Sequence, residues 1–119
     1  LARTCHADTH AFSPVAITAA DEILQATFSW HDVCGTVELS APGVTKGTAL
    51  AKLLEEIDVD PANAVAFGDM HNDLGMLELV GRGYVMADAD PCLLGRGFTR
   101  IGPNDEGAVG EQILRLLDA

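Results

Sequence analysis

The stretch Ala64–Leu77, AVAFGDMHNDLGML, decides the fold of this chain. It begins with a short, continuous apolar run, Ala64–Phe67, which is typical of a strand covered on both faces of a parallel sheet. Two aspartates, an asparagine and a histidine then crowd into Asp69–Asp73, and an apolar pattern that suits a helix follows. The stretch therefore predicts a strand, a polar turn and a helix.

The same rhythm of helix and strand runs from Thr45 to the C-terminus. Alternation of this kind predicts a doubly wound α/β fold with a parallel sheet. The further predicted elements are helices at 49–57 and 108–117, strands at 83–86 and 98–101, and a brief helical turn at 90–94.

The first part of the chain has a different pattern. Thr18, followed by two acids, is typical of a helix N-terminus and predicts a short helix to Ala26. Alternating polar and apolar residues over 27–30 and 36–40 predict a strand, a turn and a second strand. Because Ala41-Pro-Gly43 breaks this pattern, we expect one domain over 1–42 and another over 43–119.

Composition limits the class of protein. The chain has 119 residues, of which 48% are hydrophobic, and a formal net charge of −11. This acidity disfavours nucleic acid and anionic membranes as partners, because both are polyanions. No apolar run approaches the roughly 20 residues that a membrane span needs. We therefore expect no nucleic-acid partner and no membrane partner.

The three cysteines, Cys5, Cys34 and Cys92, predict free thiols in a reducing compartment, and hence a cytoplasmic location. Cys5 and His6, with His10, have the look of metal ligands. A closed zinc site needs about four ligands, however, and no second pair follows. The other interpretation of this segment is an irregular N-terminus.

The polar cluster after the first quoted strand has two interpretations. Ligands of open α/β sheets bind at the carboxyl ends of the strands, where Asp69, Asn72 and Asp73 would lie. Carboxylates and an amide suit Mg²⁺ and a phosphate group. Asn and Asp are also favoured helix caps, so the cluster equally fits a helix start without a ligand. Lys46 likewise fits either a partner of these acids or a solvated surface lysine.

Two longer stretches taken together resemble a known family. Gly43–Leu50, GVTKGTAL, and Val65–Leu77, VAFGDMHNDLGML, are similar to the third and fourth motifs of the haloacid dehalogenase-like hydrolases, closest to the Cof-type phosphatases. The resemblance continues through Gly83–Ala89, GYVMADA, and Asn104–Val109, NDEGAV. It implies the C-terminal half of a Rossmann-like parallel sheet with helices on both faces, preceded by the tail of an α/β cap domain.

The resemblance also implies a function for the site residues. It implies a Mg²⁺-dependent phosphatase that hydrolyses sugar phosphates or other small phosphorylated metabolites. Asp69 and Asp73 would form the metal site, Asp69 as a direct ligand and Asp73 by ordering the metal shell and the lysine. Lys46 and Asn72 would bind the phosphoryl group, Lys46 by neutralising charge and Asn72 by hydrogen bonding. These roles agree with phosphoryl transfer, in which positioning and electrostatic stabilisation dominate.

One part of the family pattern is missing. The family attacks phosphorus with an aspartate in a D-x-D motif directly after its first strand. The only D-x-D strings here, Asp58–Asp60 and Asp88–Asp90, do not follow an opening strand. We therefore predict that the chain is the C-terminal part of a phosphatase that acts through a phosphoaspartyl intermediate, and that it is inactive alone. We also expect its incomplete sheet to self-associate or to pair with the missing N-terminal half.

Two alternatives to a phosphatase remain open from the sequence. The chain fits a non-catalytic relic that keeps a phosphate- or metal-binding module, and it fits a plain acidic interaction domain. At Ala87-Asp88 the family prefers Gly-Asn, and we assign no role there. His71 is likewise left without a role.

Overall fold

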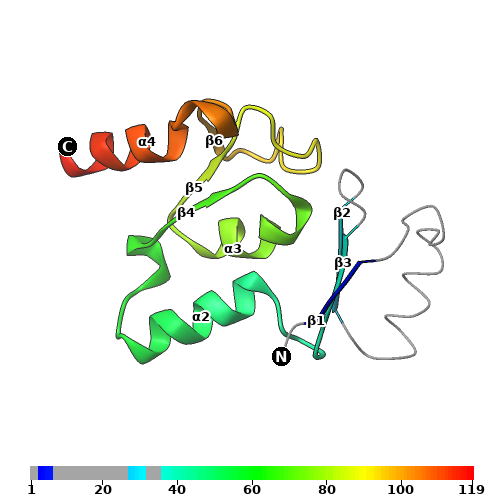
Figure 1. Cartoon of the computed structure of the whole chain (residues 1–119). Helices are drawn as coiled ribbons and strands as arrows, with labels where there is room; N and C mark the ends of the chain where they lie inside the picture. Colours follow the sequence, from blue (N-terminus) through cyan, green and yellow to red (C-terminus); the bar gives the residue numbers. More distant parts are fainter. Residues whose placement is uncertain (1–2, 7–26, 32–35) are drawn as a thin grey trace. The chain divides into compact units, whose positions relative to one another are not determined.

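The computed structural model describes residues 3–6, 27–31 and 36–119, and the chain divides into two compact units between Thr45 and Lys46. This division lies close to the predicted boundary between Pro42 and Gly43. In Figure 1 the first unit is blue to cyan, and the second unit runs from cyan-green to red. Each unit is described by itself below.

The first unit contains an antiparallel sheet with the strand order β1-β3-β2. The pairing of β2 with β3 confirms the two predicted strands, and the turn expected between them lies outside the described residues. Cys5 and His6 lie in the strand Arg3–His6, whereas His10 lies outside the described residues. The predicted helix at 18–26 lies outside the described residues. The strands are β1 (Arg3–His6), β2 (Thr27–His31) and β3 (Thr36–Ser40).

The second unit is the predicted α/β domain. Its three strands are parallel and lie in the order β4-β5-β6, with Val65 opposite Arg82 and Tyr84 opposite Thr99. Helices α2 and α3 lie on one side of the sheet and α4 on the other (Figure 1). The elements are α2 (Lys46–Glu56), β4 (Val65–Gly68), α3 (Leu74–Leu79), β5 (Arg82–Val85), β6 (Thr99–Arg100) and α4 (Ala108–Leu117).

Two predicted elements of this unit are shorter or absent. At 90–94 the structure has hydrogen-bonded turns without a helix: the Asp90 side chain accepts a hydrogen bond from the Cys92 amide, and the Asp90 carbonyl accepts one from the Leu93 amide. Gly95 and Gly97 then take a left-handed conformation with φ of 87° each, which a continuing helix excludes. The strand expected at 98–101 keeps only two residues.

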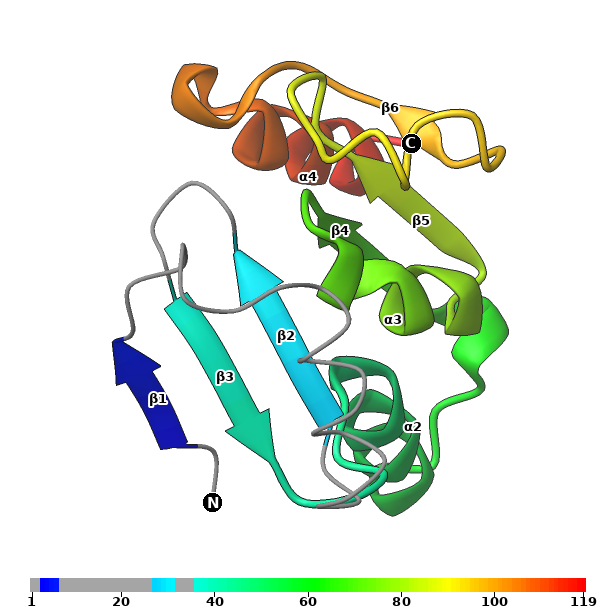
Figure 2. The same cartoon turned by 90° about the vertical axis from the view of Figure 1, so that its right-hand side faces the viewer.

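The core of this unit lies between the sheet and its helices. Leu77 of α3 and Val85 of β5 are almost fully buried, as is Leu93 in the turns that follow β5. Gly81 allows β5 to approach the turn before β4: a Cβ atom there would lie 2.0 Å from the carbonyl oxygen of Ala62. Because β4 and β5 are parallel, their carboxyl ends lie at the same edge of the sheet (Figure 2).

Helices α2 and α3 meet through two glycines. A Cβ atom on Gly47 would lie 2.8 Å from the backbone carbon of Gly75, so the helix backbones touch with no side chain between them. Lys46, the first residue of α2, is thereby placed beside the turn His71–Asp73 that precedes α3. Among the residues that the structure describes, no helix is long and apolar enough to cross a membrane.

Candidate active site

A cavity of about 410 Å³ opens at the carboxyl ends of β4 and β5. It is the place where an open α/β sheet binds its ligands. Three of the four predicted site residues line it, and they come from α2 and from the loop after β4. The lining residues are Lys46, Phe67, Gly68, Asp69, Asp73, Met76, Met86, Asn104 and Val109.

Asp73 is the buried anchor of this site. Only 3% of the residue is exposed, and one carboxylate oxygen, Oδ1, lies 2.5 Å from Nζ of Lys46. The other, Oδ2, accepts hydrogen bonds from the backbone N–H groups of Asp69 at 2.9 Å and Met70 at 3.1 Å. Burial acts to raise the pKa of Asp73, but Lys46 and the two backbone donors outweigh it and lower the pKa. Asp73 is therefore held as a carboxylate.

Gly68 makes room for that carboxylate. A Cβ atom on Gly68 would lie 2.6 Å from the Cβ atom of Asp73 and 3.0 Å from Oδ2. Only a residue without a side chain fits here, which explains why a glycine ends the strand. The turn after β4 thus folds back over its own strand end, and Asp73 ties the loop at 69–70 to Lys46.

Asp69 is partly exposed and is the first residue after β4. Its Oδ2 atom accepts a hydrogen bond from Nδ2 of Asn104 at 3.0 Å, and its backbone oxygen accepts one from the Asp90 amide at 2.7 Å. Within the part of the chain that the structure describes, no donor reaches Oδ1 of Asp69. One carboxylate oxygen of Asp69 is thus held by Asn104.

Asn72 lies in the turn between Asp69 and Asp73. Its side-chain oxygen is buried, and the residue is not one of those that line the cavity. The structure therefore brings Lys46, Asp69 and Asp73 together at the cavity and places Asn72 beside it.

Sequence reasoning missed two residues of this site. Asn104 lines the cavity, and Asp88 accepts hydrogen bonds from it. Both lie within stretches of the sequence that resemble the family, but the sequence did not indicate a role for either residue. Neither stands near Asp69 in the sequence, so spacing gave no signal.

The donor set fits a magnesium ion better than a transition metal. Among the described residues, no group of three or more His, Cys, Asp and Glu side chains could hold a metal ion. Mg²⁺ does not need such a cage, because it keeps several waters and takes one or two carboxylates together with substrate phosphates. The carboxylate of Asp69 is of the kind that such a site would use.

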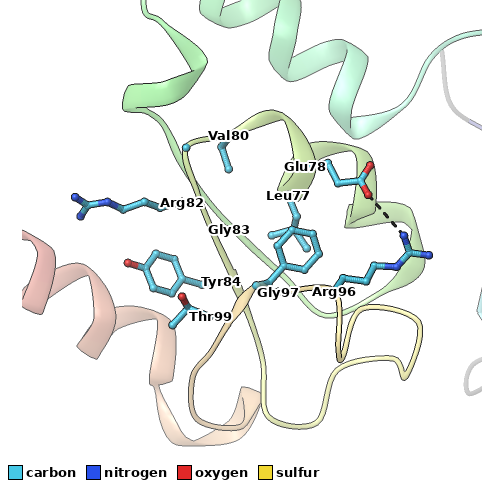
Figure 3. A pocket seen from close by; sticks show the side chains of 11 residues that line it. Leu77, Glu78, Val80, Arg82, Gly83, Tyr84, Arg96, Gly97 and Thr99 are labelled. Atoms are coloured by element: carbon cyan, nitrogen blue, oxygen red, sulfur yellow. Dashed lines mark ion pairs between the residues drawn. The ribbon is translucent and has the colours of Figure 1, made fainter.

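A larger hollow of about 550 Å³ lies at the opposite edge, where β5 and β6 begin (Figure 3). Arg82 and Tyr84 point away from its middle, while Arg96 turns toward Glu78 and forms an ion pair at 3.6 Å. Its one acid is therefore paired, and the hollow has no set of oxygen ligands for a cation. Lys46, Asp69 and Asp73 instead line the cavity at the carboxyl ends of the strands.

Comparison with known proteins shows the family of the chain. Residues 10–113 match the sequence family of the haloacid dehalogenase-like hydrolases. The chain is 37% identical over 90 residues to the pyridoxal phosphate phosphatase YbhA of Escherichia coli, covering 76% of the chain and 32% of that protein. It is 43% identical over 84 residues to the HMP-PP phosphatase of Cronobacter sakazakii, covering 69% of the chain and 31% of that protein. The chain thus spans about a third of the length of these curated relatives.

Solved structures show the same fold. A haloacid dehalogenase-like hydrolase from Bacteroides thetaiotaomicron superposes with a TM-score of 0.75 at 26% identity, covering 95% of this chain and 42% of that one. A protein from Streptococcus mutans superposes with a TM-score of 0.82 at 25% identity, covering 98% of this chain and 44% of that one. Similarity to the fold therefore extends over nearly the whole chain.

Proposed function

The chain belongs to the haloacid dehalogenase-like hydrolases, and we propose that it is the C-terminal part of a Mg²⁺-dependent phosphatase. Its substrate would be a small phosphate ester, such as a sugar phosphate. The observation that carries this proposal is the ion pair between the half-exposed Lys46 and the buried Asp73, beside Asp69 at the carboxyl end of β4. Relatives named as phosphatases of other small phosphorylated compounds support it.

We assign a role in the reaction to each site residue. An aspartate of a preceding segment would attack phosphorus and break the bond to the ester oxygen, which would take a proton from the second aspartate of the same D-x-D motif. Water would then hydrolyse the phosphoaspartate and release phosphate. Lys46 would neutralise charge on the phosphoryl oxygens and on the attacking carboxylate, while Asn72 would donate a hydrogen bond to the phosphoryl group. Mg²⁺, when bound by Asp69, would supply further charge neutralisation for the phosphoryl oxygens.

Asp73 acts on this site indirectly in the proposal. Lys46 and two backbone amides already occupy both of its carboxylate oxygens. It therefore holds the ammonium group of Lys46 in place and fixes the loop that carries Asp69. In this way it orders the metal shell and the lysine together.

The isolated chain is expected to lack phosphatase activity. A phosphoaspartyl mechanism needs its nucleophile, and we place the nucleophile in a segment that precedes this chain. The measurement is hydrolysis of p-nitrophenyl phosphate and of sugar phosphates with Mg²⁺. Adding an N-terminal segment that carries D-x-D should restore turnover, which a non-catalytic binding module would not show. Turnover by the isolated chain that disappears in Lys46→Met would contradict the proposal.

We also propose that the free edge of β4 takes another strand. Among the described strands β4 pairs only with β5, so one row of its backbone groups has no strand beside it, and Val65 is 38% exposed. In the whole protein a preceding strand would fill this edge. In the isolated chain a second copy would do so.

Self-association of the isolated chain is therefore expected, and its extent should rise with concentration. Light scattering coupled to size exclusion measures it. A co-expressed N-terminal half should compete with the dimer and abolish it. A monomer at every concentration up to the solubility limit would be evidence against an open edge.

We propose three further assignments. The first unit would be the tail of a cap domain that closes over the site and selects the substrate. The protein would be cytoplasmic, and Cys92 is a free thiol in the structure. Its partner would be a small phosphorylated metabolite rather than a nucleic acid or a membrane.

A further inference from the structure

The side-chain amide of Asn104 joins two carboxylates that lie far apart in the sequence. Its Nδ2 atom is 3.0 Å from Oδ2 of Asp69 and 3.3 Å from Oδ1 of Asp88. The backbone N–H of Asn104 also donates to Oδ1 of Asp88, at 3.1 Å. Asp88 thus holds Asn104 by both its backbone and its side chain, and Asn104 in turn holds Asp69.

The orientation of this amide follows from its neighbours. An NH₂ group has two hydrogens, and each meets a carboxylate oxygen, which accepts but does not donate. If the amide were turned over, its oxygen would face the oxygens of Asp69 and Asp88 and be repelled by both. Only one orientation of the Asn104 side chain is therefore favourable.

The loops that carry Asp88 and Asn104 are tied to each other. The backbone N–H of Ala87 donates to the carbonyl of Gly102 at 3.1 Å, and the guanidinium of Arg100 donates to the carbonyl of Ala87 at 2.6 Å. Asn104 then begins the turn Asn104–Glu106, which leads into α4. These contacts set the position of Asn104 without help from Asp69.

We propose that Asn104, held by Asp88, is a positioning residue that fixes the carboxylate of Asp69 for a divalent cation. The inference rests on the proposed function, since it assigns a role in binding the ion of that reaction. Asn104 occupies Oδ2 of Asp69, so Oδ1 is the oxygen presented to the cation. It also removes the rotational freedom of the carboxylate before the ion arrives, which lowers the entropic cost of binding.

The hydrogen-bond bridge itself is tested in the metal-free chain by NMR of the Asn104 side-chain amide. The chemical shift of each of its two protons should depend on a different one of the two carboxylates. Asp69→Ala should shift one proton resonance, and Asp88→Ala should shift the other. Asn63, an exposed asparagine outside the site, provides a reference amide that neither variant should affect. If neither variant moves an Asn104 resonance, the bridge does not exist and the inference is wrong.

The role in cation binding is tested by the Mn²⁺ dissociation constant of the whole protein, with its preceding segment, measured from free Mn²⁺ by electron paramagnetic resonance. Asn104→Ala should weaken binding by about tenfold, as substitutions of residues that orient metal ligands do. Asp88→Ala should weaken it as well, whereas Asp88→Asn keeps an acceptor for Asn104 and should retain most of the affinity. Asn63→Ala is the matched control and should bind as the wild type does.

The outcomes separate this inference from the proposed function. If the bridge is seen but Asn104→Ala binds Mn²⁺ as tightly as the wild type, Asn104 is structural only and the inference is overturned. If the whole wild-type protein binds no Mn²⁺ while the bridge is present, the proposed metal dependence fails, and the positioning role fails with it. Thermal unfolding of each variant without metal shows whether a loss of affinity reflects a loss of folded protein.

Discussion

Replacement of Lys46 by methionine is expected to lower kcat of the whole phosphatase by about 100- to 1,000-fold. Methionine keeps much of the length of the lysine side chain but removes its charge. The phosphoryl group would then lose the one ammonium group that lines the cavity among the described residues. Because this charge acts mainly as negative charge develops in the transition state, KM should change less than kcat. Steady-state kinetics on the whole protein measures both constants.

The control for this variant lies on the same helix. Lys52 is exposed on α2 and away from the cavity, so Lys52→Met removes the same charge without touching the site. It should leave kcat within experimental error of the wild type. Equal effects of the two substitutions would mean that the net charge of the protein, rather than the position of Lys46, matters.

The same substitution should also reduce stability. Asp73 would keep its two backbone donors but lose its ion pair while it remains buried. Because the side chain of Lys46 is half exposed, the expected loss is only about 1–2 kcal/mol. A double-mutant cycle of Lys46→Met with Asp73→Asn in urea unfolding isolates the energy of the pair. Additive effects of the two variants would contradict a direct interaction.

The part of the site that is local in sequence could be predicted well. The apolar run at 64–67 and the acids after it predicted a strand end with a polar turn, and the structure has both. The Cβ distances at Gly68 show why a larger residue is excluded at the end of this strand. A regular alternation of helix and strand likewise predicted the parallel sheet, because short crossovers leave few other arrangements.

The contacts between distant segments could not be predicted from spacing. Asp69 and Asn104 are 35 positions apart, and their hydrogen bond depends on how the loop after β6 returns to the sheet edge. The burial of Asp73 also depends on tertiary packing, since the sequence shows the same acid whether it caps a helix or binds a lysine. Strand β1 was missed because four residues at a chain end carry too weak a pattern.

Replacement of Gly47 by alanine is expected to destabilise the chain by about 2–3 kcal/mol, as overpacking in a tight contact does. The new Cβ atom would lie 2.8 Å and 2.9 Å from the carbonyl carbon and oxygen of Gly75. Backbone atoms cannot turn aside as a side chain can, so α2 would have to move away from α3. Urea unfolding of the chain measures the loss.

Two other helix glycines provide matched controls for this variant. A Cβ atom on Gly75 would meet only the Cα atom of Gly47, at an ordinary 3.9 Å, and one on Gly110 in α4 would meet no atom within 4 Å. Alanine at either position should therefore be neutral or stabilise the helix, by up to about 1 kcal/mol. If Gly47→Ala behaves like these two, the helices do not pack through Gly47.

The same variant connects the packing of the helices to the chemistry. Lys46 precedes Gly47, so any shift of α2 moves the ammonium group away from Asp73 and from the cavity. A misplacement on the order of 1 Å can cost about a hundredfold in rate. In the whole protein, Gly47→Ala should therefore lower kcat although it removes no functional group, while Gly75→Ala should not. A folded Gly47→Ala enzyme with full activity would show that Lys46 is held by Asp73 rather than by the approach of the two helices.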